Sequence, residues 1–348
     1  MTLPIGKMIL TPRMLPRGID PGKTRQVQQL KHASPLVACR FDPFGRYLVA
    51  ASQDNVVSRW DLKSGQRTAL TGHISWVRGL AFAPQLGMLF TGGYDGRLMA
   101  WLIDSPEPWP VRELQAHTGW IRALAISPDG KLLASCGNDQ RICVWSTVDG
   151  RLLWELKGHA SHVYNVAFHP RQRELTSADL MGGVKRWDLQ SGKLIGNLDG
   201  SVLHKYDPSF RADIGGARCM AYSPDGQYLA CGGITEVSNA FAGVGKPAIA
   251  LFDLASGKQK RLFVPKAPFQ GTMWGVAFHP EGNLIVGLAS GSGASLFFWT
   301  LDQANDFHTL ALPVIARDLD LNPDGHRLAL ACYDGSTRIF DMSNKTKA

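Results

Sequence analysis

The sequence predicts an all-β protein built from repeats, of the propeller or solenoid kind, and three observations support this. A unit seen best at residues 117–145, HTGWIRALAISPDGKLLASCGNDQRICVW, recurs along the 348-residue chain. Its spacing of roughly 40 residues is typical of such repeat architectures. Each copy contains short apolar stretches separated by turns, and the 37 glycines and 20 prolines suit many short strands joined by such turns.

Seven copies of this unit follow one another. In the second copy, for example, a first strand VRGLAF, a turn and a second strand MLFTGG precede a third strand that ends in Trp. The intervals between the turn prolines are 41 to 44 residues, except for intervals of 54 and 56 before and after Pro224. These prolines are Pro43, Pro84, Pro128, Pro170, Pro224, Pro280 and Pro323.

Departures from this period predict where loops are enlarged. The two long intervals indicate insertions in the fifth copy, near residues 201–216 and 234–246. The fourth copy is expected to have a lengthened loop around residues 179–183. Insertions in a regular repeat usually lie on one face and often serve binding.

A fourth strand follows six of the copies but not the seventh. Segments such as QRTAL and RLLWEL supply it, whereas only MSNKTKA remains after the last copy. An unmatched strand at residues 24–31 precedes the first copy, and we predict that it pairs into the last blade and closes a ring. An open ring would leave an unpaired edge and two uncovered interfaces. Residues 1–23 are expected to be an extended tail, and residues 24–348 one domain.

The recurring His, turn, Asp and terminal Trp resemble the WD40 repeat family over residues 32–341. Copies one and four end in Trp-Asp, the third in Trp-Ser, and copies five and seven in Phe-Asp. The resemblance implies a single seven-bladed β-propeller, with four-stranded antiparallel blades around a central channel.

The resemblance also implies a buried, hydrogen-bonded set in each well-matched copy. The set consists of a His before the first strand, a Ser or Thr in the second, the turn Asp and the Trp. The matching residues are His117, Ser135, Asp139 and Trp145 in the third copy, and His73, Thr91, Asp95 and Trp101 in the second. The first copy fits less well, with Ser52 as its polar strand residue, and copies five to seven lack most of the set. Because the set recurs, we expect it to be structural rather than a catalytic Ser-His-Asp arrangement.

Proteins of this family characteristically bind partners on the top face, around the channel mouth. The second residue of each first strand is one such position, and the residue before each turn Asp tends to reach the same face. The former are Ala38, Arg78, Arg122, Tyr164, Arg218, Trp274 and Arg317, and the latter Gln53, Tyr94, Asn138 and Tyr333. Arginines beside aromatic rings would suit an anionic chain. A general protein-contact face and a plain solvated surface are the alternatives, and Trp76 and Trp120 are expected to be packing residues.

The insertions of the fifth copy are a second candidate site. The alternative to a binding site is a variable surface loop. Their polar and aromatic residues are His204, Lys205, Tyr206, Phe210 and Arg211 in the first insertion and Phe241 in the second.

Enzyme, metal and membrane signatures are missing from the sequence. It contains no GxSxG, HExxH or P-loop motif, and no CxxC spacing among its six cysteines, which are expected to be buried thiols. We therefore expect no cofactor and no metal. Without a signal-peptide core or an apolar run of about 18 residues, a cytoplasmic protein without a transmembrane helix is expected.

The predicted function is that of a non-enzymatic scaffold or adaptor. It would bind a protein or peptide on the top face, and acidic segments are one class of such partners. The propeller itself is expected to be monomeric within a larger multi-protein assembly. One alternative is a nucleic-acid-associated propeller that contacts phosphates through the arginine ring, in line with the net charge of +8. A third is an enzyme that uses the channel mouth for a small anion or metal.

Overall fold

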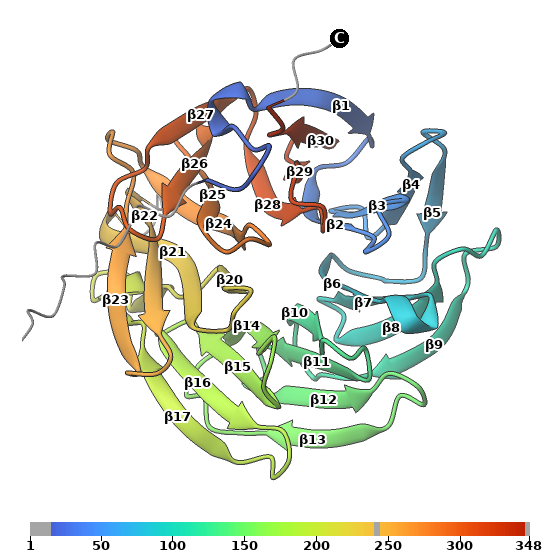
Figure 1. The fold of residues 1–348 in the computed structure, drawn as a ribbon. Coiled ribbons are helices and arrows are strands. Elements are labelled where there is room, and N and C mark those ends of the chain that lie inside the picture. Colours follow the sequence, from blue (N-terminus) through green and yellow to red (C-terminus); the bar gives the residue numbers. More distant parts are fainter. Residues whose placement is uncertain (1–14, 240–243, 345–348) are drawn as a thin grey trace, which may run out of the picture.

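Seven four-stranded antiparallel sheets form the blades of a ring around a central channel in the computed structural model, which describes residues 15–239 and 244–344 (Figure 1). The predicted fold class is therefore confirmed. In each blade the strands follow one another outward from the channel. The first blade consists of β2 (Leu36–Phe41), β3 (Tyr47–Ser52), β4 (Val57–Asp61) and β5 (Arg67–Leu70), and the second of β6 (Val77–Ala83), β7 (Met88–Gly93), β8 (Arg97–Leu102) and β9 (Pro110–Gln115). The third blade consists of β10 (Ile121–Ile126), β11 (Leu132–Gly137), β12 (Ile142–Ser146) and β13 (Leu152–Leu156), and the fourth of β14 (Val163–Phe168), β15 (Glu174–Asp179), β16 (Gly183–Asp188) and β17 (Leu194–Asp199).

The last three blades complete the ring. The fifth blade consists of β20 (Cys219–Tyr222), β21 (Tyr228–Asn239), β22 (Val244–Asp253) and β23 (Lys258–Phe263), and the sixth of β24 (Gly271–Phe278), β25 (Leu284–Gly291), β26 (Ala294–Thr300) and β27 (His308–Leu312). The seventh blade consists of β28 (Ala316–Leu321), β29 (Arg327–Cys332), β30 (Ser336–Asp341) and β1 (Arg25–Lys31). Three short 3-10 helices, η1 (Pro21–Lys23), η2 (Pro84–Leu86) and η3 (Ser201–Leu203), lie in connections, and β18 (His204–Asp207) pairs with β19 (Ala212–Gly215) in a separate hairpin.

The N-terminal strand closes the ring, as predicted. Strand β1 forms the outer strand of the last blade by antiparallel pairing with β30, from Arg25 opposite Asp341 to Lys31 opposite Ser336. The Arg25 guanidinium and the Asp341 carboxylate also form an ion pair at 3.2 Å. A further bridge joins Ile19 to Ser343. Of the predicted tail, residues 1–14 lie outside the described residues.

The hydrophobic core lies between neighbouring blades. Strands β3 and β15 are buried at every residue, whereas the outer strand β9 alternates between half-buried and exposed residues. One cluster joins Val49 of the first blade to Leu89 and Trp101 of the second. A strand that is covered on both faces reads as a continuous apolar run, which explains sequences such as YLVAAS.

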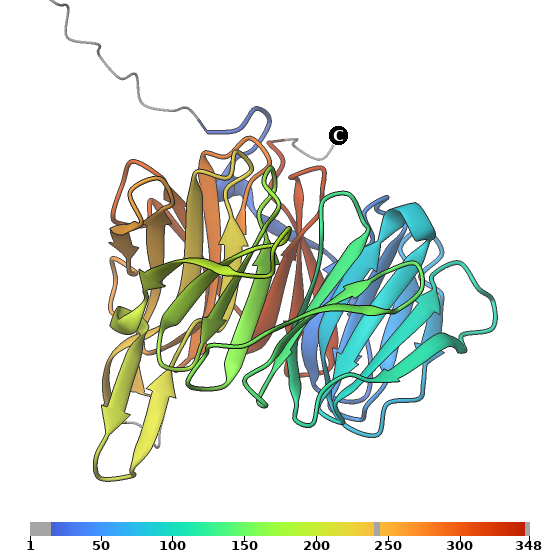
Figure 2. The same ribbon diagram turned by 90° about the horizontal axis from the view of Figure 1, so that it is seen from below.

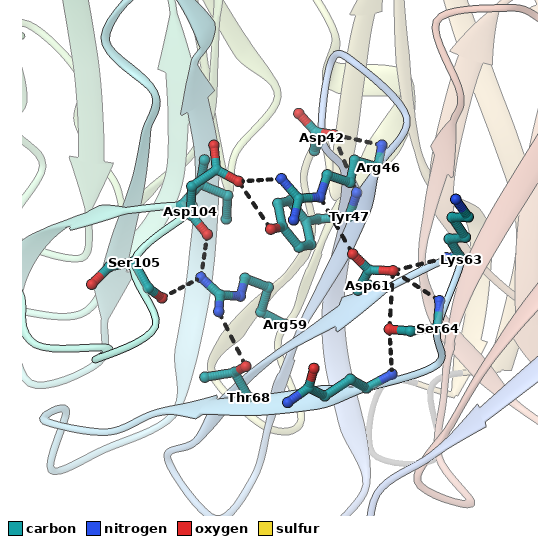
Figure 3. Close-up of polar contacts among 12 residues, drawn as sticks. Asp42, Arg46, Tyr47, Arg59, Asp61, Lys63, Ser64, Thr68, Asp104 and Ser105 are labelled. Carbon is teal, nitrogen blue, oxygen red and sulfur yellow. Dashed lines mark hydrogen bonds and ion pairs between the residues drawn. The ribbon is translucent and has the colours of Figure 1, made fainter.

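A polar cluster ties the first blade to the loop that follows β8. Arg59 of β4 is only 7% exposed. Its guanidinium donates hydrogen bonds to the carbonyl of Ile103, to the carbonyl of Ser105 at 3.1 Å and to the hydroxyl of Thr68 at 3.1 Å (Figure 3). The loop therefore has its carbonyl groups satisfied by a side chain of the neighbouring blade.

Tyr47 completes this cluster. The guanidinium carbons of Arg46 and Arg59 lie 4.6 and 5.2 Å from the centre of its ring. Its hydroxyl donates to Asp104 at 2.9 Å, and Arg46 pairs with the same carboxylate at 2.8 Å (Figure 3). These contacts join the inner part of one blade to the connection of the next.

Replacing the buried arginine should loosen this junction. We expect Arg59→Met to lower the free energy of unfolding by about 2 kcal/mol, because two carbonyl acceptors lose their donor. Urea unfolding measures this, with Lys63→Met, an exposed residue of the same cluster, as the matched control. Equal effects of the two substitutions would contradict the role given to Arg59.

Both insertions of the fifth copy emerge from the same face of the ring. The first lies between β17 and β20 and forms η3 and the β18–β19 hairpin, and the second extends β21 and β22. In an antiparallel blade, the start of the first strand and the end of the second lie at the same end. Figure 2 shows the yellow-green hairpin projecting beyond one face of the ring. The second insertion is therefore mainly a longer pair of strands rather than a loop.

The fourth copy does not contain the lengthened loop that was predicted. Only residues 180–182 separate β15 from β16, whereas residues 138–141 separate the equivalent strands of the third blade. Asp179 is the last residue of β15 and not part of a loop. Among the described residues, no helix is long and apolar enough to cross a membrane.

Candidate partner-binding site

β-Bulges aim side chains toward the channel mouth. In six blades, the pairing of the first two strands skips one residue near the start of the first strand. A bulge leaves one residue unpaired and re-aims its side chain. The skipped residues are Val37, Arg78, Arg122, Tyr164, Trp274 and Arg317. In the fifth blade, Arg218 directly precedes β20, and its backbone N–H donates to Gly232.

One residue of the predicted ring is wrong. Ala38 is fully buried and pairs with Ala51, whereas Val37 occupies the bulge and lines the channel. The first strand begins at Leu36, one residue earlier than its apolar run suggests. Because side chains alternate between faces along a strand, a one-residue error moves the assignment from the channel into the core.

Arginines and aromatic rings alternate around the mouth. The Arg122 guanidinium carbon lies 4.9 Å from the Tyr164 ring centre, and that of Arg218 lies 4.4 Å from the same ring. Arg218 and Arg317 lie 5.9 and 4.5 Å from the Trp274 ring centre. The five side chains come from the third to the seventh blade, so each ring holds cations contributed by its neighbours.

A stack of three rings continues this surface over the second and third blades. Tyr94 lies parallel to Trp120, with ring centres 4.4 Å apart, and 6.1 Å from Trp76. Arg122 lies over Trp120 at 4.9 Å and donates to the Tyr94 hydroxyl at 3.2 Å. Trp76 and Trp120 are 40% and 45% exposed. These two tryptophans, which were expected to be packing residues, are thus part of the open surface, and Tyr333 is exposed as well.

Three of the mouth arginines lack an acidic partner among the described residues. Arg122 donates to Asn138 at 2.7 Å, but neither it nor Arg218 nor Arg317 forms an ion pair with a carboxylate there. Burial lowers the pKa of Arg218 and of Arg317, because it removes water from the charged guanidinium. An anion at the mouth would compensate for that lost hydration.

Arg78 differs from these three arginines. Its guanidinium donates to the carbonyl of Val37 and lies 3.7 Å from the Asp318 carboxylate. Asp318 is paired with Arg40 at 2.6 Å as well. Arg78 is thus already used within the protein, although the sequence placed it in the same ring.

The mouth opens into a cavity of about 690 Å³ that is lined by the first strands of all seven blades. This volume lies within the usual range of ligand pockets, roughly 300–1,000 Å³. Gln53, Asn138 and Tyr333 follow the second strands at the same end of their blades. Gln53 and Tyr333 line the cavity, whereas Asn138 contacts it through its bond to Arg122.

The structure brings the two predicted buried sets together. In the second blade, His73 bonds to Thr91 at 2.8 Å and to Asp95 at 3.0 Å, and the Trp101 indole N–H donates to Thr91 at 2.9 Å. The third blade repeats this with His117, Ser135, Asp139 and Trp145, at 2.8 Å, 2.9 Å and 2.9 Å. In both blades, the hydroxyl bridges the His and the Trp, deep inside the fold.

The pKa of each aspartate in these sets is lowered. Burial alone would raise the pKa of Asp95 and Asp139, but the hydrogen bond and charge of the partner His, together with backbone N–H donors, outweigh it. The carboxylates are thus held in their charged form. In the first blade the arrangement differs: His32 bonds to Asp54 at 2.7 Å through Nε2 rather than Nδ1, and the Ser52 hydroxyl bonds to Asp54 and to the carbonyl of Val56.

The fourth blade contains a third complete set, which was not among those predicted. His159 bonds to Ser177 and to Asp179, both at 2.7 Å, and the Trp187 indole donates to Ser177 at 2.8 Å. The signal was present, because Ser177 precedes Trp187 by the same ten residues as Ser135 precedes Trp145. Asp179, however, comes two residues earlier than the other aspartates relative to its His, at the end of the strand rather than in the turn.

The second candidate surface is a folded extension of the fifth blade. Lys205 of the hairpin donates to the carbonyl of Val237 in β21 at 2.5 Å, and His204 bonds to Asp213 at 2.8 Å. Tyr206 and Phe210 are 52% and 55% exposed. Arg211 lies at the hairpin turn with a positive φ of 49°. Phe241 lies outside the described residues.

Comparison with known proteins gives matches to the same repeat. The family model described as "WD domain, G-beta repeat" matches residues 24–61, 64–101, 108–146, 150–188 and 208–234, about half of the chain. A U3 snoRNP-associated protein-like protein of Arabidopsis thaliana is 35% identical over 72 residues, 20% of this chain and 15% of that protein.

Two further relatives are similar over short stretches. DDB1- and CUL4-associated factor 10 of Danio rerio is 29% identical over 86 residues, 24% of this chain and 17% of that protein. Apoptotic protease-activating factor 1 of Mus musculus is 31% identical over 71 residues, 20% of this chain and 6% of that protein. The matched stretches thus span less than a fifth of any of these three relatives.

Proposed function

The chain belongs to the WD40 repeat family, and from this premise we propose that it is a non-enzymatic scaffold that binds an acidic segment of a protein partner at the channel mouth. Propellers of this family generally serve as interaction scaffolds within protein complexes. The names of the relatives above fit this class, because one of them is an associated factor of two other proteins.

The observation that carries the proposal is the set of three arginines that have no acidic partner within residues 15–239 and 244–344. Arg122, Arg218 and Arg317 are fixed against aromatic rings, so their guanidiniums lose little conformational freedom when they bind. Guanidinium groups match carboxylate and phosphate oxygens through two parallel hydrogen bonds. Their partly buried position strengthens such bonds relative to those on an open surface.

The aromatic faces argue against a cationic partner. The rings of Tyr94 and Trp120 each have one guanidinium of this chain over them, and those of Tyr164 and Trp274 each have two. A lysine or arginine from a partner would meet like charges on entering the mouth. The site therefore favours acidic over basic segments.

A direct binding measurement tests this proposal. We expect a fluorescein-labelled peptide of ten glutamates to bind, and the triple variant Arg122→Gln, Arg218→Gln, Arg317→Gln to bind it about 30-fold or more weakly, since charge-assisted hydrogen bonds are lost. A triple Gln variant at Arg151, Arg171 and Arg173, exposed arginines outside the channel lining, makes the same change in net charge and is the matched control.

Three outcomes would overturn the proposal. The acidic peptide could fail to bind, both triple variants could weaken binding equally, or a peptide of ten glutamines could bind as well. A 20-nucleotide single-stranded DNA serves as a second probe. If it bound in preference to the peptide, with steep loss between 0.05 and 0.3 M salt, the nucleic-acid alternative would replace the scaffold.

A further inference from the structure

In six of the seven blades, a polar residue directly follows the first strand and accepts hydrogen bonds from backbone N–H groups in or just after the turn. Four of these residues accept through oxygen, namely Asp42, Ser127, Ser223 and Asn322. In the fourth and sixth blades the acceptor is the imidazole of His169 and of His279. An imidazole binds a proton near pH 6.5, whereas a carboxylate does so only near pH 4. These two turns therefore depend on an acceptor that mild acid can protonate.

The hydrogen bonds of His169 fix the position of its ring proton. Its Nδ1 accepts from the backbone N–H groups of Arg171 and Gln172, both at 3.0 Å. Because a nitrogen that accepts cannot carry a proton, the proton lies on Nε2, which donates to the carbonyl of Gly226 at 3.1 Å. Gly226 lies in the equivalent turn of the fifth blade. One neutral imidazole thus holds its own turn and binds the neighbouring blade.

His279 repeats this arrangement between the sixth and seventh blades. Its Nδ1 accepts from the backbone N–H of Glu281 at 3.1 Å. Its ring packs so closely against Gly325, in the equivalent turn of the seventh blade, that a Cβ atom there would displace it. His169 and His279 are only 3% and 4% exposed. A second proton on either ring would have to bind Nδ1, where it would face N–H groups away from water.

The charges around His169 largely cancel. Glu174 favours protonation of the ring, whereas Arg171 and Arg186 oppose it. The Glu174 carboxylate is already paired with Arg186 at 2.6 Å, and the edge of the Tyr222 ring lies against the imidazole, with ring centres 5.1 Å apart. Burial therefore dominates and lowers the pKa of His169 below its ordinary value of 6.5.

The surroundings of His279 lead to the same result. Glu281 and Asp324 favour protonation of this imidazole, and His326 opposes it. Burial outweighs both carboxylates and lowers the pKa of His279. Both imidazoles are therefore neutral in the folded protein at neutral pH.

We propose that His169 and His279, with the turns they hold, form an acid-sensitive latch that joins the fourth blade to the fifth and the sixth blade to the seventh. Protonation of Nδ1 removes the acceptor of the turn N–H groups, so the turn and its contact with the next blade are loosened. The fifth blade, with both insertions, lies between these two junctions. The latch is independent of the proposed function.

The direction of the effect follows from the two states of the chain. In the unfolded chain each imidazole binds a proton near pH 6.5, whereas in the folded chain it does so only at lower pH. The stabilisation is therefore fully present above about pH 6.5 and is lost as the pH falls toward the pKa of the folded state. In this range each histidine raises the unfolding equilibrium constant by up to about tenfold per pH unit.

Urea unfolding of the full chain at pH 7.5 and pH 5.5 tests the latch. In the double variant His169→Asn, His279→Asn, the side-chain oxygen can still accept from the turn, as that of Asn322 does at 3.1 Å, but it does not titrate. The ratio of the unfolding constants at the two pH values should be about tenfold or more smaller in this variant than in the original chain.

The matched control is the double variant His162→Asn, His308→Asn, which removes two half-buried histidines outside these turns and should keep the original ratio. Burial raises the pKa of Asp320 to about 6, so this residue titrates in the same range. Because Asp320 is present in every variant, its effect cancels in the comparison. A ratio that is unchanged in the variant of His169 and His279, or reduced equally in the control, would overturn the latch.

A gain of acid sensitivity provides a test that does not require the double variant to fold. Asn322 directly follows β28, and its amide lies near Gly45 in the turn of the first blade, as His279 lies against Gly325. Asn322→His should therefore increase the pH ratio about threefold or more. If the double variant does not unfold cooperatively at pH 7.5, this result decides, and an unchanged ratio in Asn322→His would show that a buried imidazole at this position is not acid-sensitive.

Discussion

A chain that lacks residues 1–31 is expected not to unfold cooperatively, because it has lost the strand that closes the ring. Strand β1 contributes six paired positions against β30, and its buried Leu30 contacts the cluster between the last and first blades. Ile19, also removed, packs against the cluster of the last two blades. The apolar burial and hydrogen bonds that are lost contribute about 5 kcal/mol or more to the free energy of unfolding, which is comparable to the whole stability of a typical domain.

The measurement is thermal unfolding followed by circular dichroism. A synthetic peptide of residues 15–31, added in excess, should restore a cooperative transition, which separates loss of the strand from general damage. The point variant Leu30→Ala should lower stability by about 3 kcal/mol, whereas Gln29→Ala, exposed on the same strand, is the matched control. If the truncated chain melted like the full chain, β1 would not hold the ring closed.

Asp139→Ala is expected to lower the free energy of unfolding by about 3 kcal/mol without weakening the binding of acidic peptides. The substitution removes the carboxylate that bonds to His117 at 2.9 Å and that accepts from the backbone N–H of Thr118 at 3.1 Å. The buried polar groups that remain lose their partner. Because the set lies inside the blade and not at the mouth, its loss should act on stability alone.

The pH dependence of this effect has a definite sign. The pKa of Asp139 lies below its ordinary value in the folded protein, because the His117 contact and backbone donors outweigh burial. A carboxylate whose pKa is lower in the folded than in the unfolded chain stabilises the fold at pH values above its unfolded pKa of about 3.9. This contribution is lost as the pH falls through the pKa of the folded state. The difference in stability between the original chain and Asp139→Ala should therefore be constant near neutral pH and shrink below about pH 4.

Urea unfolding at several pH values, together with peptide anisotropy, measures both parts of this prediction. Asp149→Ala, on the surface of the same blade, is the control and should shift unfolding far less. Lost peptide binding with unchanged stability would reverse the structural role given to Asp139.

Much of the fold could be predicted from the sequence because each blade repeats the same local pattern. The turn prolines, the apolar strands and the missing fourth strand of the last copy were enough to predict seven blades and the closure by residues 24–31. The buried sets of the second and third blades were predicted because the resemblance to the WD40 repeat family implies them. The set of the fourth blade was not predicted, although Ser177 precedes Trp187 by the expected ten residues, and its Asp179 lies at the end of a strand rather than in the turn.

The candidate site was less accessible to sequence reasoning. The Ala38 assignment was wrong because a bulge and a strand start shift the register by one residue. The roles of Trp76 and Trp120 were missed because they depend on Tyr94, which stacks with both from a different connection. Arg78 could not be separated from the other arginines until its contact with Asp318, which lies 240 positions further along the chain, was known.

By itself, the sequence determined the number of blades and the closing strand, because these features arise from local patterns that recur at a fixed period. Only the tertiary structure decided which arginines lack acidic partners among the described residues and which rings they contact. Those properties arise where the first strands of different blades meet, and contacts between residues so distant along the chain depend on register and ring closure.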